Sequence, residues 1–92
     1  MNKIDRFTDR VIQVIETTRL EKGISVQQLI KDSGITRRTY FRKMRGDTDF
    51  TTSDIDALAK ALGCDAFLIL EKASGDSEEE IMARVNARID AG

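Results

Sequence analysis

The sequence predicts an all-α fold, a compact bundle of five to six short helices. Apolar residues recur at steps of three and four over most of the chain, which is the period of amphipathic helices. Proline is absent, so glycine marks the breaks between the periodic segments. Five glycines each close one such segment, at Gly23, Gly34, Gly46, Gly63 and Gly75.

The composition is that of one globular domain. The 92 residues are 40% hydrophobic and 34% charged. No apolar run approaches the roughly 20 residues that cross a bilayer, and the first six residues lack the apolar core of a secretory signal. We therefore expect a cytoplasmic protein that does not associate with membranes.

The chain is poor in cysteine and histidine, the residue types that most often act as metal ligands and as catalytic bases or nucleophiles. The chain has one cysteine, Cys64, and no histidine, so it lacks an internal disulfide, the common zinc sites and the usual general base. No motif places two carboxylates beside a nucleophile or a phosphate loop. We expect no enzyme activity, no metal and no cofactor, and no small-molecule ligand is evident. Cys64 is interpreted as a small buried apolar side chain.

Charge is distributed unevenly along the chain. Residues 1–46 contain 11 Lys and Arg against 5 Asp and Glu, a net +6, whereas residues 47–92 contain 4 against 11, a net −7. The overall charge of −1 therefore conceals one basic face and one acidic region. The acidic region would repel phosphate and favour one orientation on a nucleic acid.

The first predicted helix runs from about Lys3 to Lys22, and Gly23 stops it. One stripe of this helix carries residues at helical spacing, namely Ile4, Phe7, Val11, Val14, Ile15 and Thr18.

The second predicted helix runs from Ser25 to about Asp32. Ser25 is the expected N-cap, and Gln28 three residues later completes a capping-box pattern. Gly34 follows the helix and can adopt the left-handed conformation of a tight turn. The apolar face consists of Val26, Leu29 and Ile30.

The third predicted helix starts at Thr36 as N-cap and runs to Arg45. It contains no acidic residue, which is the most unusual local feature of the chain. Tyr40 and Met44, four residues apart, are interpreted as core. The basic residues of this helix are Arg37, Arg38, Arg42, Lys43 and Arg45.

Three further helices are predicted beyond a polar loop over Asp47–Thr51. The fourth is capped by Thr52 or Ser53 and ends at Leu62, the fifth covers Ala66–Lys72, and the last runs from a Ser77 cap through Asp90. The fourth is expected to bury Ile55, Leu58, Ala59 and Leu62.

Two short helices joined by a glycine-containing turn, the second one basic, form a helix-turn-helix over Ser25–Arg45. Residues 24–46 resemble the lambda-repressor/Cro-type (XRE-like) helix-turn-helix family, and residues 55–63 resemble the fourth helix of that family. The resemblance covers about residues 20–72. Its anchor positions are the core residue Leu29, the turn residue Gly34 and the buried residue Ile35.

The sequence departs from the family at three positions. Val26 stands where many members have a phosphate-contacting Gln, a contact that Gln27 or Gln28 can supply. Ile30 replaces a common Ala, which suggests a slightly altered crossing of the two motif helices. Met44 replaces a frequent Glu.

The resemblance implies sequence-specific binding of double-stranded DNA by a transcriptional regulator, a repressor of phage or prokaryotic type, with Thr36–Arg45 in the major groove. The protein would then lie in the bacterial cytoplasm, or in that of the host if a phage encodes it. Implied base-reading residues are Thr36, Arg37, Arg38, Phe41 and Arg42, since arginine suits the acceptors of guanine. Implied phosphate contacts are Gln27, Gln28, Thr39, Lys43, Arg45, Thr48 and Thr51.

Several alternatives stay open on the sequence. Phe41 either packs on the fourth helix or touches a thymine methyl group, and Gln27 and Gln28 are as consistent with plain surface as with contact. The basic row is read as a binding face rather than as a solvated one. An antitoxin-like interaction module that also regulates its own synthesis is the alternative function.

The last helix has two interpretations as well. Residues 1–73 are expected to form the DNA-binding domain, and residues 74–92 an amphipathic helix of the same compact unit. That helix either packs on the first helix or forms a homodimer, and a dimer on DNA is favoured because one helix-turn-helix covers about half of a typical operator. The dimer or packing face consists of Phe67, Leu70, Ile81, Met82, Val85 and Ile89.

Overall fold

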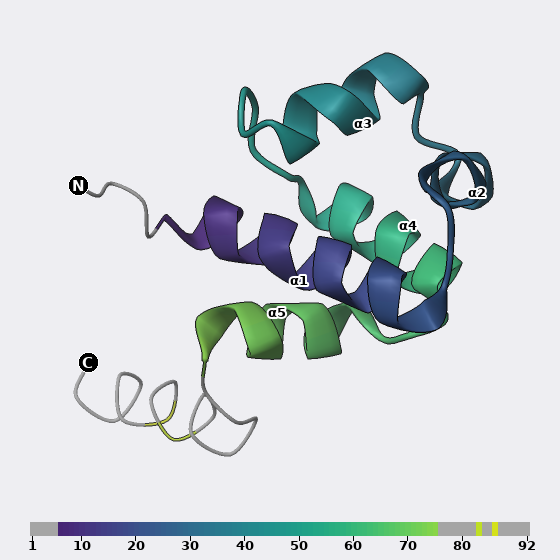
Figure 1. The fold of residues 1–92 in the computed structure, drawn as a ribbon. Coiled ribbons are helices and arrows are strands. Elements are labelled where there is room, and N and C mark those ends of the chain that lie inside the picture. The colour runs from purple at the N-terminus through teal and green to yellow at the C-terminus, as the bar shows by residue number, and fades with distance from the viewer. Residues whose placement is uncertain (1–5, 76–82, 84–85, 87–92) are drawn as a thin grey trace.

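Five α-helices and no strand make up residues 6–75 (Figure 1). The computed structural model describes these residues together with Ala83 and Asn86. None of the helices in this part of the chain is long and apolar enough to cross a membrane. The helices are α1 (Phe7–Lys22), α2 (Val26–Ser33), α3 (Arg37–Met44), α4 (Thr52–Leu62) and α5 (Ala66–Ser74).

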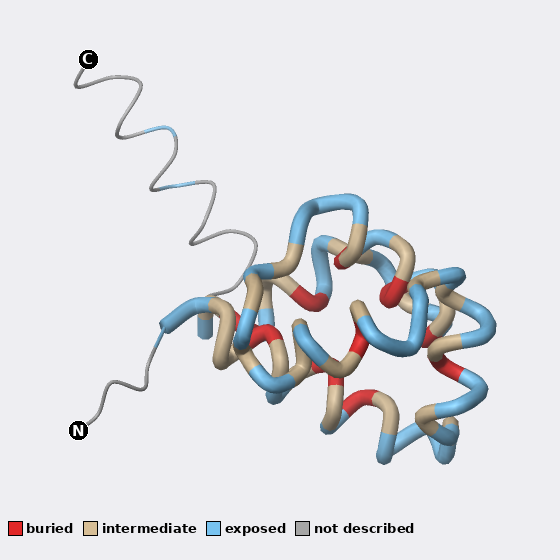
Figure 2. The backbone as a smooth tube through the Cα atoms, turned by 90° about the horizontal axis from the view of Figure 1, so that it is seen from above, coloured by how far each residue is buried: buried red, intermediate tan, exposed pale blue. Residues whose placement is uncertain are grey.

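The core lies between α1, α4 and α5, and α2 packs on α4 from one end. Buried positions line the inward sides of the helices, whereas the outward positions are exposed (Figure 2). Burying each large aliphatic side chain stabilises the fold by about 1.5–3 kcal/mol. The largest fully buried side chains are Val11, Ile15, Leu29, Leu58, Leu62 and Ile69. The predicted core faces of the first, second and fourth helices are thereby largely confirmed.

The predicted N-caps of α2 and α3 are confirmed. The Ser25 hydroxyl accepts a hydrogen bond of 3.0 Å from the amide of Gln28, and the Thr36 hydroxyl accepts one of 3.2 Å from the amide of Thr39. The capping box expected at Ser25 is only half formed, because the Gln28 side-chain amide donates to Asp32 (2.7 Å).

The cap of α4 was predicted one or two residues too late. Thr51, rather than Thr52 or Ser53, is the N-cap. The reason is Asp54, whose amide donates to the Thr51 hydroxyl (3.0 Å) while its carboxylate accepts from the Thr51 amide (2.8 Å). This reciprocal pair is a complete capping box.

The start of α1 was also predicted incorrectly. The helix begins at Phe7 rather than near Lys3, because Arg6 is extended (φ −66°, ψ 150°) and serves as the N-cap. Phe7, expected in the buried stripe, is 47% exposed. The stripe is buried from Val11 onward, and Ile4 lies outside the described residues.

The C-terminal expectations are tested continuously only as far as Gly75. Helix α5 extends to Ser74, two residues past the predicted end. Phe67 is 37% exposed, and both Leu70 and Cys64 are half-buried against the core. Of the predicted last helix only Ala83 and Asn86 are described, both helical and exposed, and its apolar residues Ile81, Met82, Val85 and Ile89 lie outside the described residues.

Candidate nucleic-acid interface

A tight turn sets the angle between α2 and α3. Gly34 ends α2 with φ of +75° and donates its amide to the Ile30 carbonyl (3.1 Å). The Ser33 hydroxyl accepts from the amide of Ile35 (3.2 Å), whose side chain packs against the core. Because Thr36 then caps the next helix, only three residues separate α2 from α3. The predicted helix-turn-helix is therefore formed.

Helix α3 lies at the edge of the molecule, on the opposite side from α5 (Figure 1). It is absent from the closest helix pairings, which join α1, α2, α4 and α5. Its attachment therefore depends on a few side chains. Tyr40 is the buried one (3% exposed), and the half-buried Phe41 and Met44 pack against the same core.

The Tyr40 ring lies near a polar pair on α1. The Arg19 guanidinium bonds to Glu16 and donates to the Ile24 carbonyl (2.9 Å), which links α1 to the connection that leads into α2. Burial raises the pKa of the Tyr40 hydroxyl, and the Glu16 carboxylate raises it further. Tyr40 therefore stays neutral and anchors α3 as a largely apolar group.

Three arginines of α3 form an exposed row. Arg37, Arg38 and Arg42 are all exposed and share one side of the helix with Phe41. No carboxylate among the described residues forms an ion pair with any of the three, although the Arg37 guanidinium lies 5.1 Å from the centroid of the Phe41 ring. The row keeps its positive charge available to a ligand.

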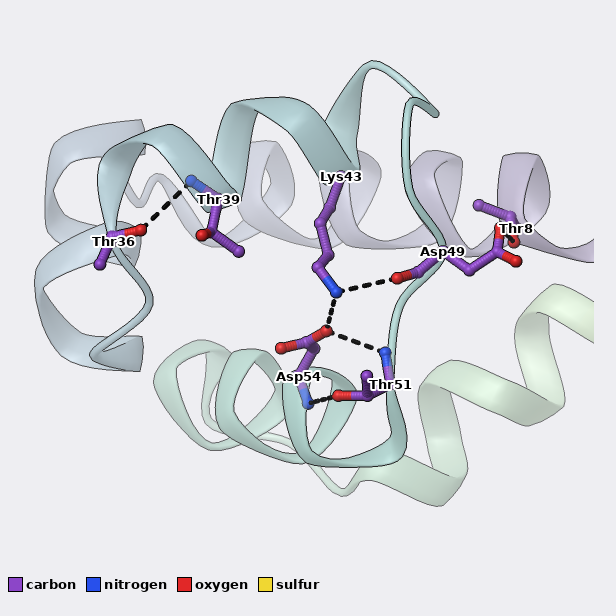
Figure 3. A network of polar contacts seen from close by, with 7 residues as sticks. All are labelled: Thr8, Thr36, Thr39, Lys43, Asp49, Thr51 and Asp54. Atoms are coloured by element: carbon purple, nitrogen blue, oxygen red, sulfur yellow. Dashed lines mark hydrogen bonds and ion pairs between the residues drawn. The ribbon is translucent and has the colours of Figure 1, made fainter.

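Lys43 lies differently from its predicted place on the outward basic face. Its ammonium points toward the start of α4, where it bonds to the Asp54 carboxylate (2.5 Å), and it also donates to the carbonyl of Asp49 in the preceding loop (2.8 Å) (Figure 3). The side chain is only 14% exposed. Lys43 thus connects α3 to the start of α4 and to the loop before it.

The electrostatics of Asp54 reflect this contact. Partial burial pushes the pKa of its carboxyl upward, but the hydrogen bonds from Lys43 and Thr51 together outweigh that effect, so the pKa is lowered. Asp54 therefore stays ionised, and the ion pair holds the end of α3 against the start of α4.

The loop after α3 carries two contacts that sequence reasoning missed. The Asp49 carboxylate accepts a hydrogen bond from the Thr8 hydroxyl (3.0 Å), which ties the loop to α1 (Figure 3). Phe50, within the loop predicted to be polar, packs against the core. Its size and apolar character, unique in this loop, are the signal that indicates its role.

The remaining predicted contact residues surround α3 unevenly. Gln27 is exposed near the start of α2, and Thr39 and Thr48 are half-buried. Thr51 is occupied as the α4 cap. Arg45 is exposed but forms a 3.1 Å ion pair with Asp47. The open positive surface is therefore concentrated on the first two turns of α3.

Comparison with known families agrees with this geometry. The family model of the Cro/C1-type HTH DNA-binding domain matches residues 16–66, more than half of the chain and the whole of α2, α3 and α4. No curated protein and no solved structure matches the chain significantly. The resemblance inferred from the sequence is confirmed, and the chain belongs to the Cro/C1-type family of helix-turn-helix DNA-binding domains.

Proposed function

We propose that this protein is a sequence-specific transcriptional regulator that inserts α3 into the major groove of double-stranded DNA. The observation that carries the proposal is the exposed row of Arg37, Arg38 and Arg42, none of which is bonded to a described carboxylate. In this family the N-terminal part of the second motif helix meets the base edges, and Arg37 and Arg38 lie there, with Arg42 one turn further along.

The proposed contacts follow from the position of each residue on or beside α3. Thr36, Arg37, Arg38, Phe41 and Arg42 are assigned to base edges, where each good arginine–guanine pair gives about 1–3 kcal/mol of discrimination. Gln27, Gln28, Thr39, Arg45, Thr48 and Thr51 are assigned to phosphates. Lys43 is removed from this group, because its ammonium is bonded to Asp54 and its side chain is only 14% exposed.

The regulator is proposed to repress by occupying a promoter, and to bind as a homodimer. A two-fold dimer would read two half-sites about one helical turn apart. Phe67, 37% exposed at the start of α5, supplies an apolar surface for this contact. Light scattering of the Phe67→Glu variant, with and without DNA, tests the dimer separately from DNA binding.

The DNA-binding proposal is tested by selecting oligonucleotides from a random pool and then measuring affinity for the selected site by fluorescence anisotropy over a salt series. Arg38→Ala is expected to weaken specific binding and to relax one base position. Lys72→Ala is the matched control, since it removes the same charge from α5. Equal behaviour of the two variants, or no enriched sequence at all, would contradict the proposal.

A further inference from the structure

Arg37 differs from the other basic side chains of α3 in what holds it in place. Its guanidinium carbon lies 5.1 Å from the centroid of the Phe41 ring, one helical turn further along. The Lys43 and Arg45 side chains are bonded to carboxylates, whereas the side chains of Arg38 and Arg42 form no ion pair or hydrogen bond within residues 6–75. Arg37 is therefore positioned without being neutralised.

The Phe41 ring that holds Arg37 is itself fixed by the core. It is half-buried and meets the Tyr40 ring edge-on, with centroids 5.3 Å apart and an interplanar angle of 85°. Tyr40 is 3% exposed. Such edge-to-face pairs are a favoured aromatic geometry. A continuous line of contacts, from Tyr40 through Phe41 to Arg37, thus connects the interior to the exposed row.

The chemistry of this contact matters for reading a base. A carboxylate partner uses up the N–H donors of a guanidinium, whereas an aromatic ring attracts the cation through its face. The five donors of Arg37 therefore stay available to the O6 and N7 acceptors of guanine. A side chain already held near its bound position also loses less conformational freedom on binding.

We infer that Arg37 is the main guanine-reading residue of α3 and that Phe41 is its positioning residue. The inference rests on the proposed DNA-binding function and adds which side chain dominates sequence discrimination. Arg38 and Arg42, which lack such support, are expected to discriminate less strongly at their own base positions than Arg37 does at its guanine.

The experiment measures the affinity of the full chain for the selected site and for each of its single-base-pair variants. Arg37→Ala is expected to remove a preference of about five- to a hundredfold at one G·C pair. Phe41→Leu keeps an apolar side chain but removes the ring, so the preference at that same pair should fall about two- to fivefold. Phe41→Tyr keeps the ring face, so this variant should retain the wild-type preference at that base pair.

Arg38→Ala is the matched control, because it removes an arginine of the same helix that has no ring contact. In the Arg37→Ala background, adding Phe41→Leu should not reduce the preference at the G·C pair that Arg37 reads any further. In the Arg38→Ala background, adding Phe41→Leu should still reduce that preference about two- to fivefold. Affinity for unrelated DNA, together with circular dichroism, reports whether each variant is folded.

Three results would overturn the inference. The first is that Arg37→Ala removes the preference at no G·C pair of the selected site. The second is that Phe41→Leu changes the preference only at a T·A pair, which would assign Phe41 to a thymine methyl group. The third is failure of Phe41→Tyr to retain the preference in a folded protein. In each case the wild-type chain still selects a sequence, so the failure is separate from that of the proposed function, in which no sequence is selected.

Discussion

The Lys43 ammonium lies 2.5 Å from the Asp54 carboxylate, and this ion pair connects the last turn of α3 to the first turn of α4. The two side chains are only 14% and 17% exposed. Asp54 also completes the capping box with Thr51. One carboxylate therefore stabilises the start of α4 and fixes the end of the proposed DNA-reading helix.

We expect Asp54→Asn to destabilise the protein by about 1–3 kcal/mol, since it leaves the Lys43 ammonium poorly paired in a half-buried place. The asparagine can still accept from the Thr51 amide, so Asp54→Ala should cost about 1 kcal/mol more, because it also removes this side-chain half of the capping box. Urea unfolding at pH 7 measures both.

Asp56→Asn provides the control. Asp56 forms an i,i+4 ion pair with Lys60 in the same helix, with side chains 54% and 76% exposed. Exposed pairs of this kind contribute less than about 0.5 kcal/mol. If Asp54→Asn were as mild as Asp56→Asn, the Lys43 contact would have no structural role.

Acidification should weaken the fold through the same carboxyl group. The pKa of Asp54 is lower in the folded state than its ordinary value of 3.8, so the folded state favours the ionised form. The resulting stability is fully present above that value and is lost as the pH falls through and below it. Stability measured by urea unfolding from pH 7 to about pH 3 should decline less in Asp54→Asn than in the wild type.

Lys43→Met sharpens this experiment. It keeps most of the apolar stem of Lys43 and removes the charge that holds the Asp54 carboxylate ionised. The acid-dependent loss should therefore shrink in this variant too. Parallel pH curves for the wild type and both variants would show that other carboxylates govern the acid response.

The fold was largely predictable because its signals are local. Ser25 and Thr36 are N-caps, Gly34 closes α2, and the spacing of Leu58 and Leu62 matches their burial. Each of these features depends on residues within one or two helical turns. The resemblance to the Cro/C1-type family rested on the same local spacing.

The contacts of individual side chains were less predictable, because they depend on residues that are distant in the sequence. Lys43 was grouped with the outward arginines, yet it lies three residues after the buried Tyr40 and so on that side of the helix. Thr51 and Ser53 each precede an aspartate by three residues, and the bond of Asp54 to Lys43 favours the Thr51 cap.

Gly34→Ala should destabilise the protein by about 1–2 kcal/mol, because a side chain at φ of +75° is strained. A Cβ at this position would meet no atom within 4 Å, so the cost belongs to the backbone alone. Gly34→Asn should cost less, since asparagine tolerates the left-handed conformation better. Thermal unfolding compares the two; an alanine variant as stable as the asparagine one would contradict a left-handed turn.

Asp47→Asn should strengthen binding to DNA of any sequence. Asp47 holds the exposed Arg45 side chain by an ion pair of 3.1 Å and a hydrogen bond from Nε of the same length. Removing the carboxylate frees Arg45 for a phosphate and takes one negative charge away from the proposed interface. Affinity should rise a few-fold, and the slope of log K against log salt should steepen by about 0.9 for the added phosphate contact.

The gain should not depend on sequence, since phosphates carry no base information. Glu21→Gln makes the same change of charge on the exposed side of α1, beside Lys72 of α5, and should leave both affinity and salt slope near the wild-type values. An equal gain in the two variants would indicate a response to net charge alone. A gain confined to Asp47→Asn, with an unchanged ratio of specific to non-specific affinity, would place Arg45 at the DNA backbone.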